Sequence, residues 1–221
     1  FRGRPCVLYL MALKPCTENS AVFLDPLLFW GRESAQLWSQ VLRAIPPEPK
    51  RRIRALVSDN LRGMKSLARH NGWVLQLCHF HLISQLQGRR GRKKTTLAGR
   101  TIRERLYQLT RQALELPDGP LLQGTPRRLR STVSKPLPAR KMRMAVREFL
   151  RDIHHYRACR IYPELGLPAT TNTVEAMGHR IRDLMRRTRN LRSQDSLLLW
   201  TTAFIRKRPA LVCNGKHFPP N

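Results

Sequence analysis

The sequence predicts an α/β protein: a mixed sheet flanked by helices, with an all-helical insertion before its last long helix. Two apolar runs open the chain, and a strand–helix–strand pattern follows over residues 53–77. A basic stretch without strand-like alternation then fills residues 88–166. Short links between a strand, a helix and a second strand favour a parallel pair, which is typical of α/β folds.

The first elements are predicted to be two antiparallel strands and a helix. The apolar runs at residues 5–13 and 21–30 are separated by a polar turn, which predicts a hairpin. Residues 33–45 place their apolar side chains on one helical face. The proline cluster at residues 46–49 is expected to end that helix, because proline has no backbone N–H to continue it.

The parallel unit follows the proline cluster. Its first strand runs directly into Asp59, and its second strand runs into Cys78 and His81. The carboxyl ends of parallel strands are where α/β sheets place ligand-binding and catalytic groups. The elements of this unit are expected over residues 53–57 (a buried strand), 61–70 (a helix), 73–77 (a second strand) and 82–86 (a further helix).

The remaining chain is predicted to be mostly helical. Helices are expected near residues 101–116 and 139–157, joined by a connection at 117–138. A long helical element should run over residues 172–207, and the tail after Pro209 is expected to be irregular. We therefore divide the chain into the first part of the sheet domain (1–86), the helical insertion (87–167), and the final helices with the tail (168–221).

The charge of the chain points to a polyanionic partner. The 221 residues include 42 lysine and arginine residues against 14 aspartate and glutamate residues, which gives a net charge of +28. Nucleic acid is the expected ligand, because cationic side chains that neutralise phosphates release condensed counterions. No apolar stretch of about 18 residues is present, so a membrane span is not expected. The five scattered cysteines do not suggest a disulfide framework.

Acidic residues are scarce in this chain, so their positions are informative. Asp59 follows a predicted parallel strand, and Glu175 lies on a predicted helix beside Arg182 and Arg186. Two carboxylates from separate elements could hold Mg²⁺ or Mn²⁺ through oxygen ligands, and such ions support phosphodiester chemistry. The alternatives are that Asp59 only caps the next helix and that Glu175 only pairs with arginines.

Two segments, ALVSDNLRGMKSLARHNGWVLQLCHFHL and TTNTVEAMGHRIRDLMRRTRNLRSQDSLLLW, resemble the Mutator-like group of bacterial insertion-sequence transposases. The resemblance covers about residues 5–86 and 168–207. It implies an RNase H-like fold with a helical insertion before the last catalytic acid, and DDE-type DNA cleavage and strand transfer that uses Mg²⁺ or Mn²⁺. It implies Asp59 and Glu175 as catalytic metal ligands. The residues that carry the resemblance are Asp59 and Gly63, Cys78 and His81, Asn172 and Glu175, and Trp200.

One part of the family pattern has no counterpart in this sequence. The resemblance places the first catalytic aspartate on a strand before the opening hairpin, and we expect that strand upstream of Phe1. It would be the central strand of the sheet, so the chain as given is expected to be inactive. Asp25 is a poor substitute, because it lies within the second apolar run and precedes Pro26.

Cysteine and histidine residues offer a different interpretation, a zinc site. Cys78 and His81 could form one half of such a site, but His154, His155 and Cys159 do not have the spacing of a second half. We therefore expect Cys78 and His81 to be structural and to bind no zinc, with Asn172 as a further structural residue of the motif. The tryptophans lie in apolar periodic segments, and we expect them to be core residues rather than base-stacking platforms.

The basic segments are expected to follow the DNA backbone. The expected partners are the transposon ends and the target DNA, with a homo-oligomer as the active form, in the bacterial cytoplasm and associated with the nucleoid. The alternatives are a non-enzymatic basic nucleic-acid-binding protein, of ribosomal or architectural type, and an inactive transposase remnant. The residues expected to contact phosphates are Arg89, Arg90, Arg92, Lys93, Lys94, Arg180, Arg182, Arg186, Arg187, Arg189 and Arg192.

Overall fold

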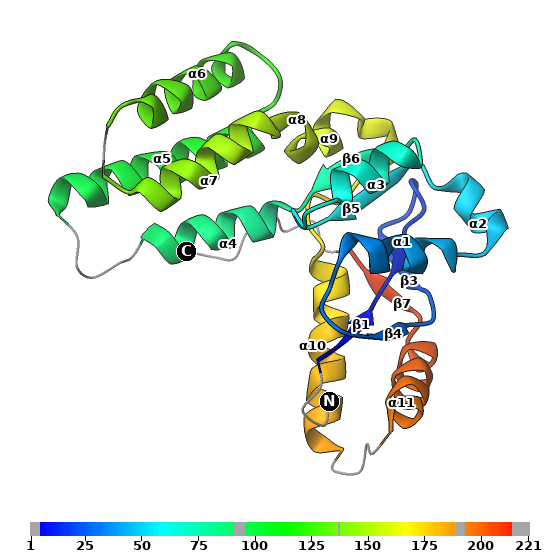
Figure 1. Ribbon diagram of the computed structural model, residues 1–221. Coiled ribbons are helices and arrows are strands. Elements are labelled where there is room, and N and C mark those ends of the chain that lie inside the picture. Colours follow the sequence, from blue (N-terminus) through cyan, green and yellow to red (C-terminus); the bar gives the residue numbers. More distant parts are fainter. Residues whose placement is uncertain (1–4, 91–95, 137, 189–192, 214–221) are drawn as a thin grey trace.

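The computed structural model describes residues 5–90, 96–136, 138–188 and 193–213, and within these ranges the protein is mixed α/β with mostly helical elements (Figure 1). The α/β class predicted from the sequence is confirmed at this level. Among the described helices, none is long and apolar enough to cross a lipid bilayer.

The N-terminal strands form the predicted hairpin, but each apolar run is broken into two short strands. β1 (Cys6–Tyr9) pairs antiparallel with β4 (Leu27–Trp30), and β2 (Ala12–Leu13) pairs antiparallel with β3 (Ser20–Phe23). Pro26 lies between β3 and β4 and cannot donate a backbone hydrogen bond to a ladder. The two pairs therefore belong to separate small sheets.

The prediction of an irregular C-terminal tail is wrong for residues 210–212, and residues 214–221 of that tail lie outside the described residues. Residues Ala210–Val212 form β7, which pairs antiparallel with β3 and gives the order β2-β3-β7. The pairing is extended at both ends, because Phe23 N donates to Pro209 O over 2.7 Å and Cys213 N donates to Asn19 O over 2.6 Å. The free edge of β3 thus determines the conformation of a segment whose own sequence shows no strand pattern.

The first two helices differ from the prediction in one respect. α1 (Ala35–Arg43) is capped by Ser34, whose hydroxyl accepts from Leu37 N over 3.2 Å. The proline cluster ends α1 as expected, but it also starts a second helix, α2 (Pro47–Arg52). Pro47 is the first residue of α2, a position where the backbone N–H has no helical partner and proline is favoured.

The predicted parallel unit is present. β5 (Ala55–Ser58) and β6 (Val74–Leu77) pair in parallel, and α3 (Met64–His70) connects them. β6 is largely buried, whereas every residue of β5 is only half-buried, so the expectation of a buried first strand is wrong. The reason is that β6 is the only strand paired with β5 in the described residues.

The insertion is helical, with one more long helix than predicted. α6 occupies most of the stretch predicted as a connection; its first residue is a proline and a second proline lies inside it. The predicted domain boundary at residues 86–87 falls inside α4. The elements are α4 (His79–Arg90), α5 (Leu97–Glu115), α6 (Pro120–Ser134), α7 (Arg140–Arg151), α8 (Ile153–Tyr156), α9 (Ala158–Ile161) and the 3₁₀ turn η1 (Pro163–Leu165).

The chain then returns to the N-terminal strands through α10 (Asn172–Arg187) and α11 (Gln194–Lys207) (Figure 1). The predicted start of the long helical element at residue 172 is confirmed, because α10 begins at Asn172. The expectation that the tryptophans are core residues fails at two positions: Trp30 is 48% exposed and Trp200 is 52% exposed.

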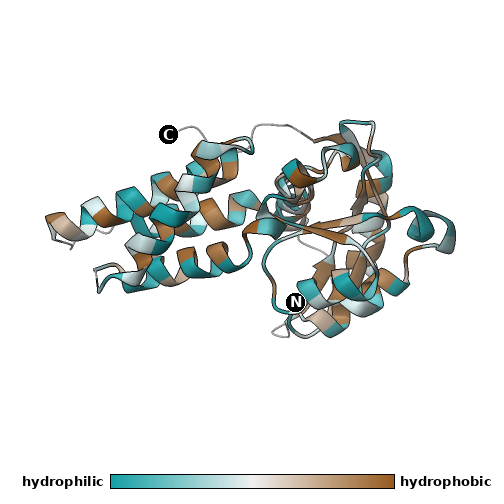
Figure 2. Cartoon of the chain, turned by 90° about the horizontal axis from the view of Figure 1, so that it is seen from above, coloured by the Kyte–Doolittle hydropathy of each residue, from teal (hydrophilic) through white to brown (hydrophobic). Residues whose placement is uncertain are grey.

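The described residues have two hydrophobic cores. The larger core joins the β5–β6 unit to the insertion, and it includes Leu77, Leu82, Leu106, Leu129 and Phe149. In Figure 2 the helices of the insertion carry both hydrophobic and hydrophilic residues around each helix, as expected for amphipathic helices that pack together. The smaller core joins the N-terminal strands to α10 and α11, and its buried members are Phe23, Met177, Ile181 and Ile205.

Candidate metal centre

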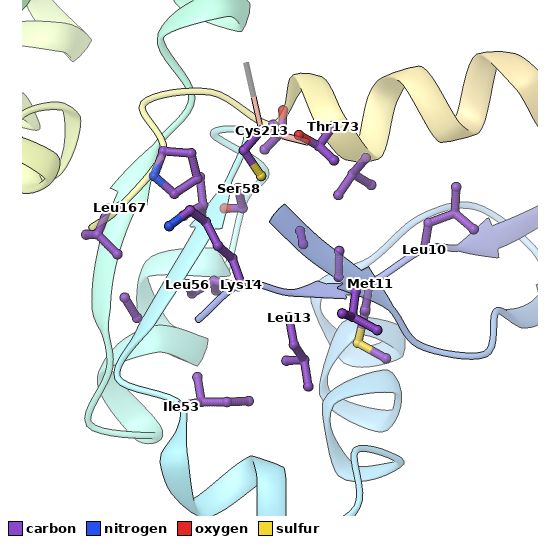
Figure 3. Close-up of a pocket in the computed structure, with 18 of the residues that line it drawn as sticks. Leu10, Met11, Leu13, Lys14, Ile53, Leu56, Ser58, Leu167, Thr173 and Cys213 are labelled. Atoms are coloured by element: carbon purple, nitrogen blue, oxygen red, sulfur yellow. The ribbon is translucent and has the colours of Figure 1, made fainter. Parts of the chain in front are cut away.

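A cavity of about 1160 Å³ separates the N-terminal strands from β5 (Figure 3). Its walls include every residue of 7–16, which covers most of β1 and all of β2, and every residue of 52–59, which covers β5. Successive side chains of a strand point to opposite faces of its sheet, so a cavity that faced the sheet would contact only every second residue. A cavity lined by consecutive residues therefore faces the edge of the strand. Figure 3 shows Leu13 and Ile53 among the apolar side chains that line the space between these two edges.

Asp59 lies at this cavity, immediately after the carboxyl end of β5, where the sequence placed it. It is half-buried. The alternative that Asp59 caps the following helix is wrong, because the N-cap of α3 is Gly63. Asp59 is therefore available for chemistry at the cavity.

Gly63 fixes the start of α3 against α1. Its backbone φ is +99°, a conformation that residues with a Cβ adopt at a cost. A Cβ added at Gly63 would lie 2.4 Å from the Cβ of Ala35, the first residue of α1. Glycine thus permits both the backbone turn and the close approach of two helices next to Asp59.

Glu175 lies in the first turn of α10 and also lines the cavity. Its Oε1 accepts a hydrogen bond from Thr171 Oγ1 at 2.5 Å and lies 3.6 Å from His81 Nδ1. Among the described residues its ion partner is this histidine, which is not the arginine pairing that the helical pattern suggested. Arg186 pairs instead with Asp183, over 3.2 Å.

Cys78 and His81 join Glu175 from the other side. Cys78 directly follows β6 and is buried, and His81 lies in the first turn of α4, which begins three residues earlier than the helix predicted at residues 82–86. The backbone N and the Oγ1 of Thr171 each lie 3.3 Å from Cys78 Sγ. The sulfur, the imidazole and the carboxylate each offer one ligand atom, and these atoms all lie within 4.8 Å of one another.

The electrostatics of this cluster favour an imidazolium next to a thiolate. The hydrogen bond with Cys78 raises the pKa of His81 to about 9, and the negative charges of Glu175 and Asp59 add to this effect. Burial by itself would raise the pKa of Cys78, but its hydrogen bonds with His81 and Thr171 outweigh burial and lower that pKa.

The structure brings together four of the residues that the sequence singled out, although not with equal closeness. Cys78, His81 and Glu175 form the close group. Asp59 lines the same cavity and acts on His81 through its charge, but it is not a member of that group. Asn172, the further structural residue of the motif, is the first residue of α10.

Thr171 was missed as a site residue. The available signal was its position four residues before Glu175, which places its hydroxyl next to the carboxylate at the start of a helix.

The other residues considered for metal chemistry lie elsewhere. Asp25 pairs with Arg206 of α11 over 2.6 Å, so it belongs to a link between the strands and α11. Cys159 donates its backbone N–H to Gln76 Oε1 over 2.7 Å. His154 and His155 lie on α8 with their rings 3.9 Å apart. Among the described residues, none of these four is in the close group around Glu175.

The basic residues expected to contact phosphates differ in their availability. Arg180, Arg182, Arg186 and Arg187 are exposed on α10. Arg90, in contrast, pairs with Glu104 and stacks on the ring of Tyr107 at 4.7 Å, so it is engaged within the protein. Arg89 is half-buried at the end of α4. The expected contacts that lie outside the described residues are Arg92, Lys93, Lys94, Arg189 and Arg192.

Comparisons of the chain with models of protein families, with curated proteins and with solved structures found no match.

Proposed function

We propose that this chain is the RNase H-like catalytic domain of a Mutator-like DNA transposase, which cleaves and joins DNA by metal-dependent phosphoryl transfer. The observation that carries the proposal is that Asp59 and Glu175, from elements far apart in the sequence, line one cavity. Asp59 follows a parallel strand and Glu175 begins a late helix, and both positions agree with those that the resemblance implies.

The two carboxylates are suited to Mg²⁺ or Mn²⁺, because these ions prefer oxygen ligands. A bound divalent ion would activate the attacking oxygen and stabilise the leaving oxygen of the phosphodiester. Asp59 and Glu175 would hold it, and Thr171 would orient Glu175 through the hydroxyl that donates to Oε1. Arg182 lines the cavity as well, so its guanidinium could bind a DNA phosphate there.

The cavity also supports the expectation of a further strand that carries a third acid. Two strand edges face it, and the side chains between them are mostly apolar, such as Leu13 and Leu56. A strand added between these two edges would close the sheet if it paired with both, with each neighbour about 4.7–4.9 Å away. The same strand would bring an aspartate next to Asp59 and Glu175 in the fold that the resemblance implies.

The rival function is a nucleic-acid-binding protein without catalysis, for which the net charge of +28 would suffice. Metal dependence separates the two. A pure binding protein would bind DNA equally well with a chelator present and would cut nothing, whereas the transposase would bind but not cut in chelator.

The test uses the chain together with the strand that the resemblance places before it, on supercoiled DNA and on DNA with transposon ends. We expect nicking and strand transfer with Mg²⁺ or Mn²⁺, and their loss in Asp59→Asn and Glu175→Gln. Asp183→Asn is the matched control, because Asp183 is an exposed acid on the same helix as Glu175. Normal cleavage by Asp59→Asn or Glu175→Gln would show that this residue is not catalytic.

A further inference from the structure

We propose that Cys78, His81 and Glu175 form a binding site for a thiophilic divalent cation of the Zn²⁺ type, with one coordination position open to water or another ligand. The inference does not depend on the proposed function, because it concerns ion binding and not DNA cleavage. It reverses the expectation that Cys78 and His81 bind no zinc. That expectation considered only cysteine and histidine as zinc ligands. The third ligand here is a glutamate, Glu175 of α10.

The geometry of the cluster is close to that of a tetrahedral zinc site. Zinc bonds of about 2.0–2.3 Å place neighbouring ligand atoms about 3.3–3.8 Å apart. His81 Nδ1 and Glu175 Oε1 already lie at such a separation, 3.6 Å. All three ligand atoms lie within 4.8 Å of one another, so no pair exceeds the upper tetrahedral separation by more than about 1 Å.

The surrounding hydrogen bonds suit a metal-bound thiolate and carboxylate. Thr171 donates its backbone N–H to Cys78 Sγ, and its hydroxyl contacts both that sulfur and Glu175 Oε1. The single hydroxyl proton cannot be donated to both acceptors at once. Once a cation neutralises the sulfur, the Thr171 hydroxyl can donate its hydrogen bond to Glu175 alone. The backbone N–H of Thr171 then remains the donor to Cys78 Sγ. Partners of this kind orient metal ligands and raise metal affinity.

The donor set selects the type of ion. A sulfur and an imidazole nitrogen are poor ligands for Mg²⁺, which prefers oxygen, but they are common ligands for Zn²⁺. Cys78 is buried, so the sulfur is shielded from bulk solvent, whereas His81 is exposed enough to leave a path for the ion. Because Glu175 would belong to both metal sites, Zn²⁺ should inhibit any Mg²⁺-dependent reaction that needs this carboxylate.

The test is a titration of the metal-free full-length chain with Co²⁺, which replaces Zn²⁺ and gives an absorption band when a thiolate binds it. We expect saturation at one Co²⁺ per chain, displacement by Zn²⁺, and no displacement by a large excess of Mg²⁺. Cys78→Ser should remove the thiolate band, and His81→Asn and Glu175→Gln should weaken Co²⁺ binding at least about tenfold. Cys159→Ser is the matched control, because Cys159 is a partly buried cysteine outside the cluster.

Folding of each variant is checked by circular dichroism, and a second measurement is the rise in melting temperature that Zn²⁺ produces. This rise should be present in the wild type and in Cys159→Ser, and small or absent in the other three variants. A wild-type protein without the thiolate band, or a band that survives in Cys78→Ser, would overturn the inference. A normal band in a complete protein that cleaves no DNA would leave this site standing and refute the proposed function instead.

Discussion

Gly63→Ala is the substitution whose effect follows most directly from the structure. The added methyl group destabilises the fold in two separate ways. It places a residue with a Cβ at a backbone φ of +99°, which such residues avoid, and it lies 2.4 Å from the Cβ of Ala35. The backbone cost is about 1–2 kcal/mol. Overpacking of two helices costs a further 1–3 kcal/mol or so. We therefore expect Gly63→Ala to lower the free energy of unfolding by about 2–5 kcal/mol.

A second glycine separates these two costs. Gly72 also has a positive φ, +69°, but a Cβ added there would meet nothing within 4 Å. Gly72→Ala should therefore show the backbone cost alone, about 1–2 kcal/mol. The difference between the two variants estimates the steric cost at Gly63.

The steric cost can also be measured by a double-mutant cycle in urea. Ala35→Gly removes the methyl group that Gly63→Ala would strike, at a helix-propensity cost of at most about 1 kcal/mol. We expect the double variant to recover about 1–3 kcal/mol relative to the sum of the single effects. If the two effects add to within about 0.5 kcal/mol, the close contact between α1 and α3 does not exist and the reasoning is refuted.

Three further predictions concern charge. In the metal-free protein, NMR should show the imidazole of His81 titrating near its raised pKa of about 9. Cys78→Ser should move that pKa toward 6.5, because the hydrogen bond with the Cys78 sulfur that raises it is lost, and an unchanged pKa would contradict this. Asp152→Asn should destabilise the protein by about 1.5–3 kcal/mol at neutral pH, since Asp152 is buried and accepts from Lys65 Nζ at 2.5 Å. The hydrogen bonds of Asp152, chiefly that from Lys65, outweigh burial and lower the pKa of Asp152. Urea titrations should therefore show that the difference in free energy of unfolding between Asp152→Asn and wild type shrinks as pH falls below 3.8. A difference that stays constant with pH would refute this. DNA affinity should fall steeply and log-linearly with salt, with little preference among unrelated duplexes, and a shallow slope in a salt titration would count against phosphate-dominated binding.

The parallel unit could be predicted because its information is local. The strand before Asp59, the helix after it and the strand before Cys78 each have their own apolar pattern, and the short links between them leave little choice of topology. The position of Asp59 at a strand end followed from these patterns alone. The burial of β5 could not be predicted in this way, because it depends on what lies next to the open edge of that strand.

The errors have long-range or proline-dependent causes. β7 is a strand only because β3 offers a free edge to it. α6 contains two prolines and was predicted as a connection, yet one of them is at the first position and the helix packs against α5 and α7. The close group around Glu175 could not be foreseen, since it combines Cys78, between β6 and α4, and His81 of α4 with a residue of α10.

The position of this cluster between the two hydrophobic cores gives a bound ion a role in holding the protein together. Cys78 and His81 flank residues of the larger core, whereas Glu175 precedes Met177 of the smaller core on α10. Hydrogen bonds already join the two sides: His79 N donates to Ala169 O over 2.9 Å, and Thr171 N donates to Cys78 Sγ. An ion that ligates both sides binds only when they are docked, so at a concentration 100 times its dissociation constant it would add about 2.7 kcal/mol to that docking. Resistance to proteolysis between α9 and α10 would then report ion occupancy, without any reaction taking place.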